Sequence, residues 1–293
     1  MKLTIAKSAG YCFGVKRAVN MVYQEAEEAK VPVYTYGPII HNEEVVRDLK
    51  QRGVHVVREL KELENLPKGK IIIRSHGISR REHEAMKACG FEVLDATCPF
   101  VLKIHRLVEK YSKEGYRIVI AGNEHHPEVE GILGWVEGQP AYTVTSQEDI
   151  EKLPLKEGEK VCLVAQTTFN YNKFQELVEI INKKGYDITV LNTICNATEE
   201  RQTQSRALAK EVEAMIVVGG KSSSNTQKLF EICKNECANT YYIQTIDDLD
   251  PAVLRTIDNV GITAGASTPN KIIEEVQNNV RLSLIHISEP TRH

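Results

Sequence analysis

Three of the seven cysteines occupy the same kind of place, a turn between an apolar run of strand length and a helical stretch. They are Cys12 in LTIAKSAGYCFGVKRAV, Cys98 in FEVLDATCPFVLKIH and Cys195 in DITVLNTICNATEERQ. The start of a helix stabilises negative charge, so a thiol placed there ionises more easily and suits a metal ligand. Three such thiolates, with no fourth cysteine or histidine at an equivalent position, predict an incompletely ligated metal centre.

The residue types leave the identity of that metal open. A [4Fe–4S] cluster ordinarily takes four cysteines, so three would leave one iron available as a Lewis acid. A zinc ion held by three cysteines and a water fits the same spacing. The remaining cysteines are interpreted as core residues, because cysteine is among the most buried residue types; they are Cys89, Cys162, Cys233 and Cys237.

The cysteine turns recur along the chain at similar spacing, 86 residues from Cys12 to Cys98 and 97 residues from Cys98 to Cys195. Two further polar turns follow each cysteine, one after 28 or 29 residues and another after 64 to 72 residues. The residues at these six turns are His41 and His76, His126 and Thr167, and Ser223 and Ser267. This pattern predicts one structural unit that occurs three times.

Apolar runs of strand length alternate with amphipathic helical stretches throughout, which is typical of an α/β protein with parallel sheets. Ligands of such sheets lie outside the carboxyl ends of the strands, at the loops that lead into helices. We therefore expect three similar α/β units with pseudo-threefold symmetry around a central cluster site. The predicted units are residues 1–97, 98–194 and 195–281.

The final stretch, LSLIHISEPTRH at residues 282–293, resembles an in-frame translation of a sequencing-library adaptor. We expect it to be a non-native tail, attached where the natural chain is cut near Arg281. What the natural chain carries beyond that point is left open.

Side chains at the six polar turns, together with backbone N–H groups at predicted helix starts, are suited to holding an anion. In GKSSSN, Ser223, Ser224 and Asn225 can donate hydrogen bonds to a ligand or simply cap a helix. Ser267, in AGASTPN, has the same two interpretations.

Histidines at three corresponding turns favour the anion-binding interpretation. His41, His76 and His126 can each present a donor to a phosphate. The other histidines considered lie off the repeat and are interpreted as structural; they are His55, His83, His105 and His125.

Glu128 in HHPEVEG is the one carboxylate predicted to act as a proton donor. It follows Pro127 at a helix start, where an acidic residue is also favoured by the helix dipole alone. A partly dry pocket and the neighbouring His126 would set its pKa. Thr167 could position the proton through its hydroxyl, with Thr168 as the alternative.

Composition restricts the class of protein. The 293 residues are 42% hydrophobic and 26% charged, which is ordinary for a globular chain of about two domains. A net charge of −3 and a pI near 6.3 give no bulk signal for nucleic acid. No apolar run reaches membrane-spanning length, and the N-terminus lacks a signal-peptide core. We expect a cytoplasmic protein without nucleic-acid or membrane partners.

Several short segments in fixed order resemble the 4-hydroxy-3-methylbut-2-enyl diphosphate reductase family over residues 1 to about 281. They are GYCFGVKRAV, HNEEVV, SHGIS, DATCP, HPEVEG, QTT, the turn that contains Cys195, SSSN and TAGAS. The resemblance implies an oxygen-sensitive iron–sulfur oxidoreductase whose [4Fe–4S] cluster is bound by Cys12, Cys98 and Cys195. It also implies that Glu128 donates protons, with His126 beside it, and that Thr167 contacts the substrate hydroxyl. The positions matching the family's diphosphate-binding residues are His41, His76, His126, Ser223, Ser224, Asn225 and Ser267.

The implied reaction is reductive dehydroxylation of (E)-4-hydroxy-3-methylbut-2-enyl diphosphate to isopentenyl and dimethylallyl diphosphate. Two electrons would pass through the cluster, whose open iron would bind the substrate hydroxyl. No GxGxxG or flavin signature is present, so a protein electron donor such as ferredoxin or flavodoxin is expected. Two alternatives are a hydro-lyase that uses an open-iron cluster without net electron transfer, and a zinc-bound phosphate-sensing module.

Overall fold

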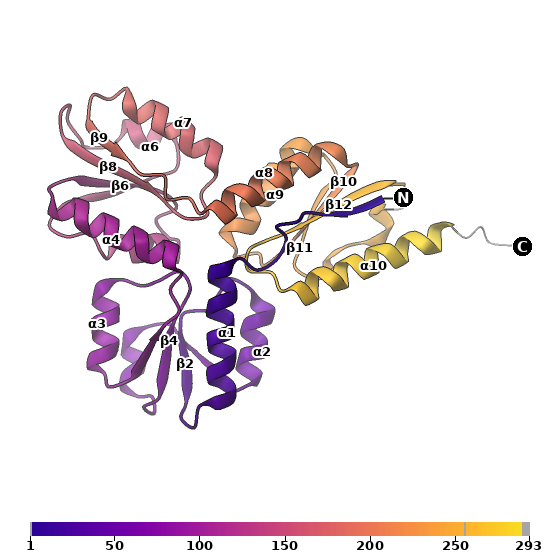
Figure 1. Ribbon diagram of the computed structural model, residues 1–293, viewed down its shortest axis with the longest axis horizontal. Helices are drawn as coiled ribbons and strands as arrows, with labels where there is room; N and C mark the ends of the chain where they lie inside the picture. The colour runs from indigo at the N-terminus through magenta and orange to yellow at the C-terminus, as the bar shows by residue number, and fades with distance from the viewer. Residues whose placement is uncertain (1, 255, 289–293) are drawn as a thin grey trace, which may run out of the picture. The chain divides into compact units, whose positions relative to one another are not determined.

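Strands of the chain form three separate four-stranded sheets, each entirely parallel, in a computed structural model that describes residues 2–254 and 256–288 (Figure 1). Two compact units can be distinguished. The central unit comprises residues 13–40 and 46–195 and holds two of the sheets. The terminal unit comprises residues 1–12, 41–45 and 196 onward and holds the third.

The first sheet has the strand order β3-β2-β4-β5. Its strands are β2 (Val33–Tyr36), β3 (His55–Val57), β4 (Lys70–Ile73) and β5 (Glu92–Asp95). The helices along this stretch are α1 (Phe13–Glu28), α2 (Glu43–Gln51), the 3-10 helix η1 (Leu60–Glu64) and α3 (Arg80–Ala88). The central strand β4 reads KIII and buries Ile71, Ile72 and Ile73 completely, as expected of a parallel strand covered on both faces.

The second sheet, also in the central unit, has the order β7-β6-β8-β9. Its strands are β6 (Arg117–Ala121), β7 (Ala141–Val144), β8 (Lys160–Ala165) and β9 (Asp187–Val190). Its helices are α4 (Pro99–Lys113), α5 (Pro127–Leu133), α6 (Gln147–Glu151) and α7 (Tyr171–Asn182). Helix α4 covers one face, where Ile104 packs with Ile118, and α7 covers the other, where Phe174 packs with Leu163 (Figure 1).

The third sheet has the order β1-β12-β10-β11 and therefore contains the first strand of the chain. Its strands are β1 (Lys2–Ile5), β10 (Ala214–Val218), β11 (Thr240–Ile243) and β12 (Asn259–Ala264). Its helices are α8 (Asn196–Glu211), α9 (Ser224–Glu236), η2 (Ile246–Asp248), η3 (Pro251–Leu254) and α10 (Asn270–Ser288). Strand β1 pairs with β12 in the register Lys2↔Asn259 to Ile5↔Ile262.

All three sheets follow one strand order when β1 is given the place that β5 and β9 take in the other two. Each of these edge strands leads to a predicted ligand, β1 to Cys12, β5 to Cys98 and β9 to Cys195, and a helix starts at the next residue. The predicted α/β class with parallel sheets is confirmed. The boundaries at residues 97 and 194 and the pseudo-threefold arrangement stay predictions. The predicted non-native tail extends into 289–293, outside the described residues.

Within the described ranges, no helix combines the length and the apolar character that a membrane crossing requires.

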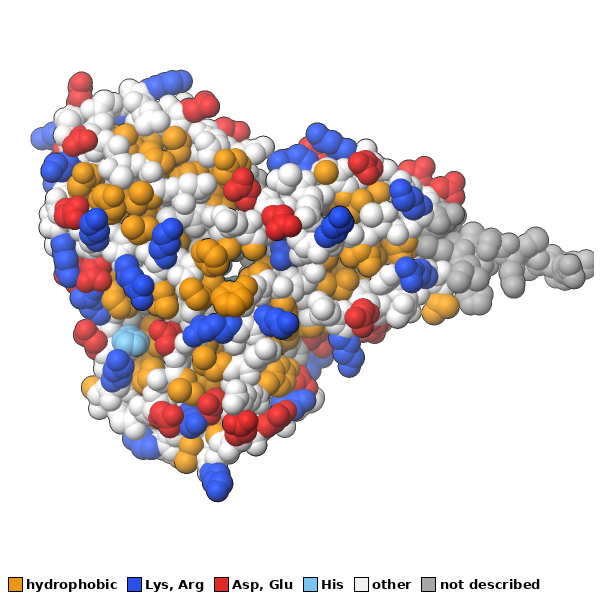
Figure 2. Space-filling view, viewed as in Figure 1, with side chains coloured by type: hydrophobic (Ala, Val, Ile, Leu, Met, Phe, Trp, Pro, Cys, Tyr) orange, Lys and Arg blue, Asp and Glu red, His pale blue; other side chains and the backbone are white. Residues whose placement is uncertain are grey.

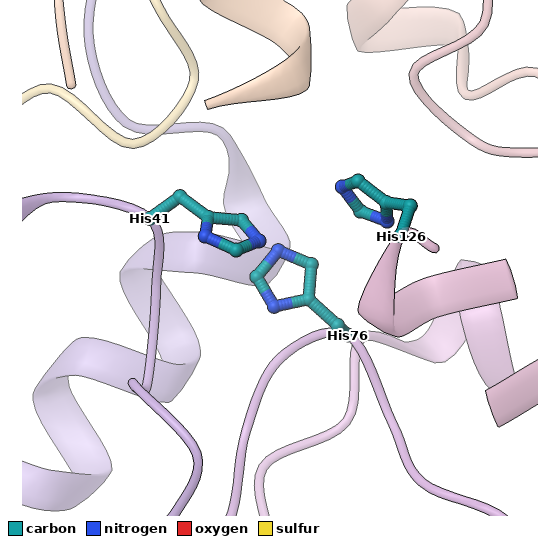
Figure 3. A group of neighbouring side chains, drawn as sticks. All are labelled: His41, His76 and His126. Carbon is teal, nitrogen blue, oxygen red and sulfur yellow. The ribbon is translucent and has the colours of Figure 1, made fainter. Parts of the chain in front are cut away.

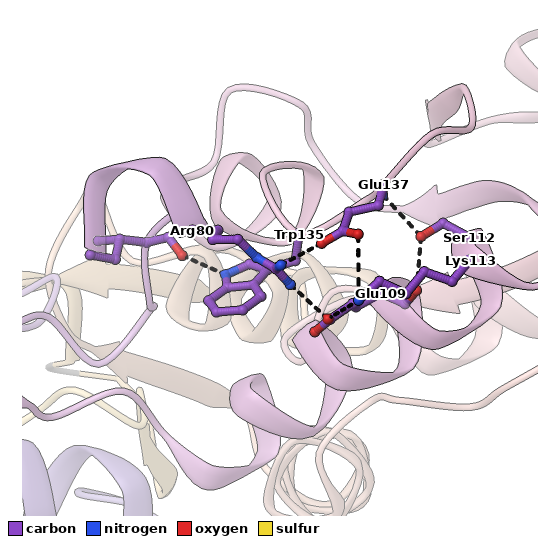
Figure 4. Close-up of polar contacts among 7 residues, drawn as sticks. Arg80, Glu109, Ser112, Lys113, Trp135 and Glu137 are labelled. Atoms are coloured by element: carbon purple, nitrogen blue, oxygen red, sulfur yellow. Dashed lines mark hydrogen bonds and ion pairs between the residues drawn. The ribbon is translucent and has the colours of Figure 1, made fainter. Parts of the chain in front are cut away.

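A tryptophan and an arginine join the layers of the first and second sheets within the central unit (Figure 4). Trp135 Nε1 donates a hydrogen bond to the Ile78 carbonyl at 2.8 Å, and the Arg80 guanidinium lies 4.8 Å from the centre of the indole ring. Arg80 also forms ion pairs with Glu109, at 2.7 Å, and with Glu137. Because Ile78 follows the His76 turn and Trp135 follows α5, this joint holds two of the predicted site turns.

Replacing Trp135 in two steps separates the parts of this joint. Trp135→Phe keeps an aromatic ring beside Arg80 but removes the hydrogen bond to Ile78, so we expect the free energy of unfolding to fall by about 1 kcal/mol. Trp135→Ala removes the ring as well and should lower it by about 3 kcal/mol. Urea unfolding followed by far-ultraviolet circular dichroism measures both. Equal stability of all three proteins would show that the joint contributes nothing.

Candidate active site

The same backbone hydrogen bond occurs at all three cysteine turns. The amide of Cys98 donates to the Ser75 carbonyl at 3.0 Å, and the amide of Cys195 donates to the Thr167 carbonyl at 3.0 Å. In the terminal unit, the amide of Cys12 donates to the Ala266 carbonyl at 3.3 Å. Each acceptor lies in the third polar turn of a predicted unit, the turn that comes 64 to 72 residues after the cysteine of that unit. The acceptor is itself a candidate site residue or is next to one. Every predicted ligand is therefore fixed to a predicted polar turn.

The start of α1 packs directly on the sulfur of Cys98. A methyl group on Gly14 would overlap Cys98 Sγ, well inside the 3.0 Å that real Cβ contacts keep. Arg17, one turn later, donates hydrogen bonds to the carbonyls of Thr97 and Asp95, each at 3.1 Å. Residue types alone did not single out Gly14 or Arg17, although the second glycine of GYCFG was the available signal.

Glu128 is buried and held by one residue. Its side chain is 2% exposed. The Thr167 amide donates to Oε1 at 2.6 Å, and the Thr167 hydroxyl lies 2.8 Å from Oε2. The neighbouring Thr168 hydroxyl instead accepts from Gln166 at 3.0 Å. Of the two threonines considered, Thr167 is the one that contacts the carboxyl.

Burial raises the pKa of Glu128 from its ordinary value of 4.5 to about 7. The two hydrogen bonds from Thr167 act in the opposite direction because they stabilise the carboxylate, but burial outweighs them. A carboxyl with this pKa holds its proton to near neutrality and can still release it, which suits a general acid. Once protonated, Glu128 can itself donate to the Thr167 hydroxyl.

His76 and His126 lie edge to face in the central unit, with ring centres 5.6 Å apart and planes at 77° (Figure 3). His126 caps the start of α5, where its Nδ1 accepts the Glu128 amide at 3.1 Å. In the neutral ring the proton is therefore assigned to Nε2, which makes Nε2 a donor. His41, also drawn in Figure 3, belongs to the terminal unit.

Three predicted residues of the terminal unit lie together. The Ser267 hydroxyl donates to the His41 carbonyl at 3.1 Å and lies 3.4 Å from the Ser223 hydroxyl. Ser223 caps α9 by accepting the Thr226 amide at 3.3 Å. Ser224 is the first residue of α9. Ser223 therefore caps a helix and also belongs to the group of predicted site residues.

Asn225 is the residue of this group whose hydrogen bonding points most directly to a ligand. It lies in the first turn of α9 and is 4% exposed, yet neither its amide nitrogen nor its oxygen has a hydrogen-bond partner among the described residues. A buried polar side chain in this state is costly unless a ligand completes its bonds. The start of α9 adds backbone N–H groups and the positive end of the helix dipole, so the missing partner is expected to be an anion.

Two glycines allow neighbouring segments of the terminal unit to pack closely around these predicted site residues. A methyl group on Gly265 would overlap the Thr226 hydroxyl, and one on Gly220 would come within 2.7 Å of the His41 carbonyl. Neither glycine was predicted as a site residue. Both lie in short segments that contain predicted site residues, Gly265 in TAGAS and Gly220 in GKSSSN. The glycines of those segments were therefore the available signal.

Residues interpreted as structural lie in the core or at the surface. Burial raises the pKa of Cys162 and of Cys233 to about 12, so neither thiol is suited to ligation at neutral pH. His105 is buried, stacked on Trp135 with ring centres 5.3 Å apart, and burial lowers its pKa to about 4. His125 is exposed.

The family model described as LytB protein matches residues 3–281. The chain belongs to the LytB family. One relative of this LytB chain is a 4-hydroxy-3-methylbut-2-enyl diphosphate reductase of Caldanaerobacter subterraneus subsp. tengcongensis, 48% identical over 96% of the chain and 97% of the relative. Another, of the same name, from Geobacter sulfurreducens, is 45% identical over 94% of the chain and 95% of the relative.

Two solved structures resemble the LytB chain over 96% of its length. One is a structure of (E)-4-hydroxy-3-methyl-but-2-enyl diphosphate reductase, described as the terminal enzyme of the non-mevalonate pathway, with 43% identity, a TM-score of 0.70 and complete coverage of that chain. The other is the E-1-hydroxy-2-methyl-but-2-enyl-4-diphosphate reductase of Plasmodium falciparum, with 30% identity, a TM-score of 0.89 and 87% coverage of that chain. The predicted family resemblance is confirmed.

Stability should depend on pH through Glu128. Its folded pKa, about 7, lies above the ordinary 4.5, so the folded state holds this proton more tightly than the unfolded state. The resulting stabilisation is complete below pH 4.5 and is lost as pH rises through 7. Between pH 5 and 8 we expect a loss of up to about 3 kcal/mol that Glu128→Gln does not show.

Urea midpoints of the native protein and of Glu128→Gln, measured across this pH range, test the expectation. Glu130→Gln is the matched control, since Glu130 lies on the same helix and is exposed. Parallel pH curves for the native protein and Glu128→Gln would contradict the raised pKa.

Proposed function

We propose that this LytB-family chain reduces (E)-4-hydroxy-3-methylbut-2-enyl diphosphate to isopentenyl and dimethylallyl diphosphate. The observation that carries the proposal is the buried Glu128 carboxyl, bonded to Thr167 and protonated up to about pH 7. It supplies the acid that removal of a hydroxyl as water requires. Relatives that share 45–48% of their residues with nearly the whole chain bear the name of this activity.

Cys12, Cys98 and Cys195 would hold the cluster that the family resemblance implies. Each thiol stands immediately before a helix, and each cysteine amide is fixed by a hydrogen bond. Cys12 lies two residues before Gly14, so chain continuity alone keeps their Cα atoms within about 7 Å. Gly14 in turn packs on Cys98 Sγ. The donor set and this close approach fit a thiolate-bound cluster.

When bound by three thiolates, a [4Fe–4S] cluster offers one iron as a Lewis acid for the substrate hydroxyl and passes electrons one at a time. Overall, two electrons and two protons are consumed. The C–O bond breaks, the hydroxyl leaves as water with one proton, and the second proton is added to one end of the allylic system. Glu128 is the proposed donor of these protons, and Thr167 orients its carboxyl and contacts the substrate hydroxyl.

The diphosphate end of the substrate would be bound by two groups of donors. In the terminal unit these are His41, Ser223, Ser224, Asn225 and Ser267, around the start of α9. In the central unit they are His76 and His126, and the neutral ring of His126 carries its proton on Nε2. The unpartnered amide of Asn225 supports this assignment, because a phosphate oxygen would accept its N–H. Electrons are proposed to come from ferredoxin or flavodoxin.

An anaerobic assay with reduced methyl viologen tests this function. We expect isopentenyl and dimethylallyl diphosphates to form with two electrons consumed per molecule, and no product without reductant. Glu128→Gln should lower kcat by about 100-fold or more, as expected for loss of a general acid. The matched control Glu130→Gln should retain activity. Turnover without reductant would instead identify a hydro-lyase, and near-normal kcat in Glu128→Gln would remove Glu128 from its role.

A methyl group on Gly14 should displace the Cys98 sulfur. We expect Gly14→Ala, purified without oxygen, to retain less than about half of the iron and sulfide of the native protein, because one thiolate ligand is lost from the set. Gly131→Ala is the control, since a methyl group there meets its nearest neighbour at an ordinary 3.4 Å. Full iron content in Gly14→Ala would contradict the proposed ligand set.

A further inference from the structure

Two large aromatic side chains are exposed directly beside predicted cluster ligands. Phe13 is 68% exposed and follows Cys12, and Phe100 is 43% exposed and lies two residues after Cys98. Among the described residues only four large hydrophobic side chains are this exposed, and these are two of them. Exposed apolar side chains that gather in one patch mark interaction sites more often than those scattered singly.

The two aromatic residues extend from one contact within the central unit. Phe13 is bonded to Gly14, which packs on Cys98 Sγ, and Phe100 lies in the first turn of the helix that follows Cys98. The starts of α1 and α4 therefore lie side by side. In the space-filling view, the region over the start of α1 shows hydrophobic side chains bordered by Lys or Arg (Figure 2).

The early part of each helix that carries these aromatic residues has charged side chains of one sign only. Lys16 on α1, and Lys103 and Arg106 on α4, are exposed. The first acidic residue of α1 is Glu25 and that of α4 is Glu109, so every charged side chain before them on these two helices is basic. The whole chain has a net charge of −3, so this positive region differs from the average surface. The positive ends of two helix dipoles add to it.

We propose that this face, made of Phe13, Lys16, Phe100, Lys103 and Arg106, is the docking surface for an acidic one-electron carrier protein. The inference rests on the proposed function, which needs two electrons from outside the chain. Opposite charge steers the carrier to the face, and the aromatic side chains provide the apolar centre of a small, transient interface. A carrier bound there would lie beside residues close in sequence to two of the proposed ligands, Cys12 and Cys98.

Charge reversal on α4, in the double variant Lys103→Glu, Arg106→Glu, tests the proposal with two reductants. With a reduced acidic bacterial ferredoxin, we expect kcat/KM for the carrier to fall by about tenfold at low salt. Its decline with rising salt should also flatten, because the steering charges are gone. With reduced methyl viologen the rate should stay within about twofold, since a small cation is not repelled by new carboxylates.

The matched control is Lys152→Glu, Lys156→Glu, which makes the same change in charge at exposed positions before β8, at the opposite end of that strand from Thr167. It should behave as the native protein with both reductants. Phe100→Ser should weaken the reaction with ferredoxin alone.

Each other outcome overturns the proposal. Unchanged ferredoxin kinetics in the α4 variant would show that the carrier binds elsewhere. An equal loss with both reductants would show that these residues serve the site itself. A lower molecular mass in the variant than in the native protein would show that the face joins two copies of the chain. Failure of the native chain with viologen would overturn the proposed function itself, and the docking surface with it.

Discussion

One backbone hydrogen bond, made three times, organises the molecule. In each sheet the amide of the cysteine that follows an edge strand donates to the polar turn that follows the adjacent strand. The bond uses only main-chain atoms, so it constrains where the turns lie without constraining their side chains. The third polar turn can therefore carry His76 in one sheet, Thr167 in another and Ser267 in the third, and a threefold repeat can support a site whose parts have different chemistry.

The groups best suited to chemistry are the ones that weaken the ligand-free fold. Glu128 is buried where ionisation is unfavourable, and Asn225 is buried with neither amide atom hydrogen-bonded to any residue that the structure describes. An apolar residue of similar size at position 225 would bury no amide without a partner. Three sheets with fully buried strands such as Ile71–Ile73 provide the stability that offsets these two positions. Substrate binding explains the presence of these two residues better than folding does. A proton acceptor would interact with Glu128, and an anion would bind the amide of Asn225.

Local periodicity was enough to predict the α/β class, the cysteines before helices and the matching offsets of the polar turns. It could not predict that β1 completes the third sheet, because that pairing joins residues about 257 apart and leaves no local signal. Gly14 was missed because its role depends on a sulfur 84 residues away, and the lack of a partner at Asn225 is visible only once its neighbours are placed. The choice of Thr167 over Thr168 likewise depended on which hydroxyl faces Glu128.

Residues outside the site also decide its geometry. His76 stands two residues before Ile78, whose carbonyl accepts the Trp135 indole N–H, and Trp135 directly follows the C-cap of the helix that His126 caps at its start. The 5.6 Å between the two imidazole rings is therefore set from both sides by a joint that touches neither ring. Since Arg80 completes this joint through ion pairs to Glu109 on α4 and to Glu137 before β7, the spacing of the proposed phosphate donors depends on packing between the layers of two sheets. A substitution at the joint is expected to act on substrate binding through distance, without changing any donor.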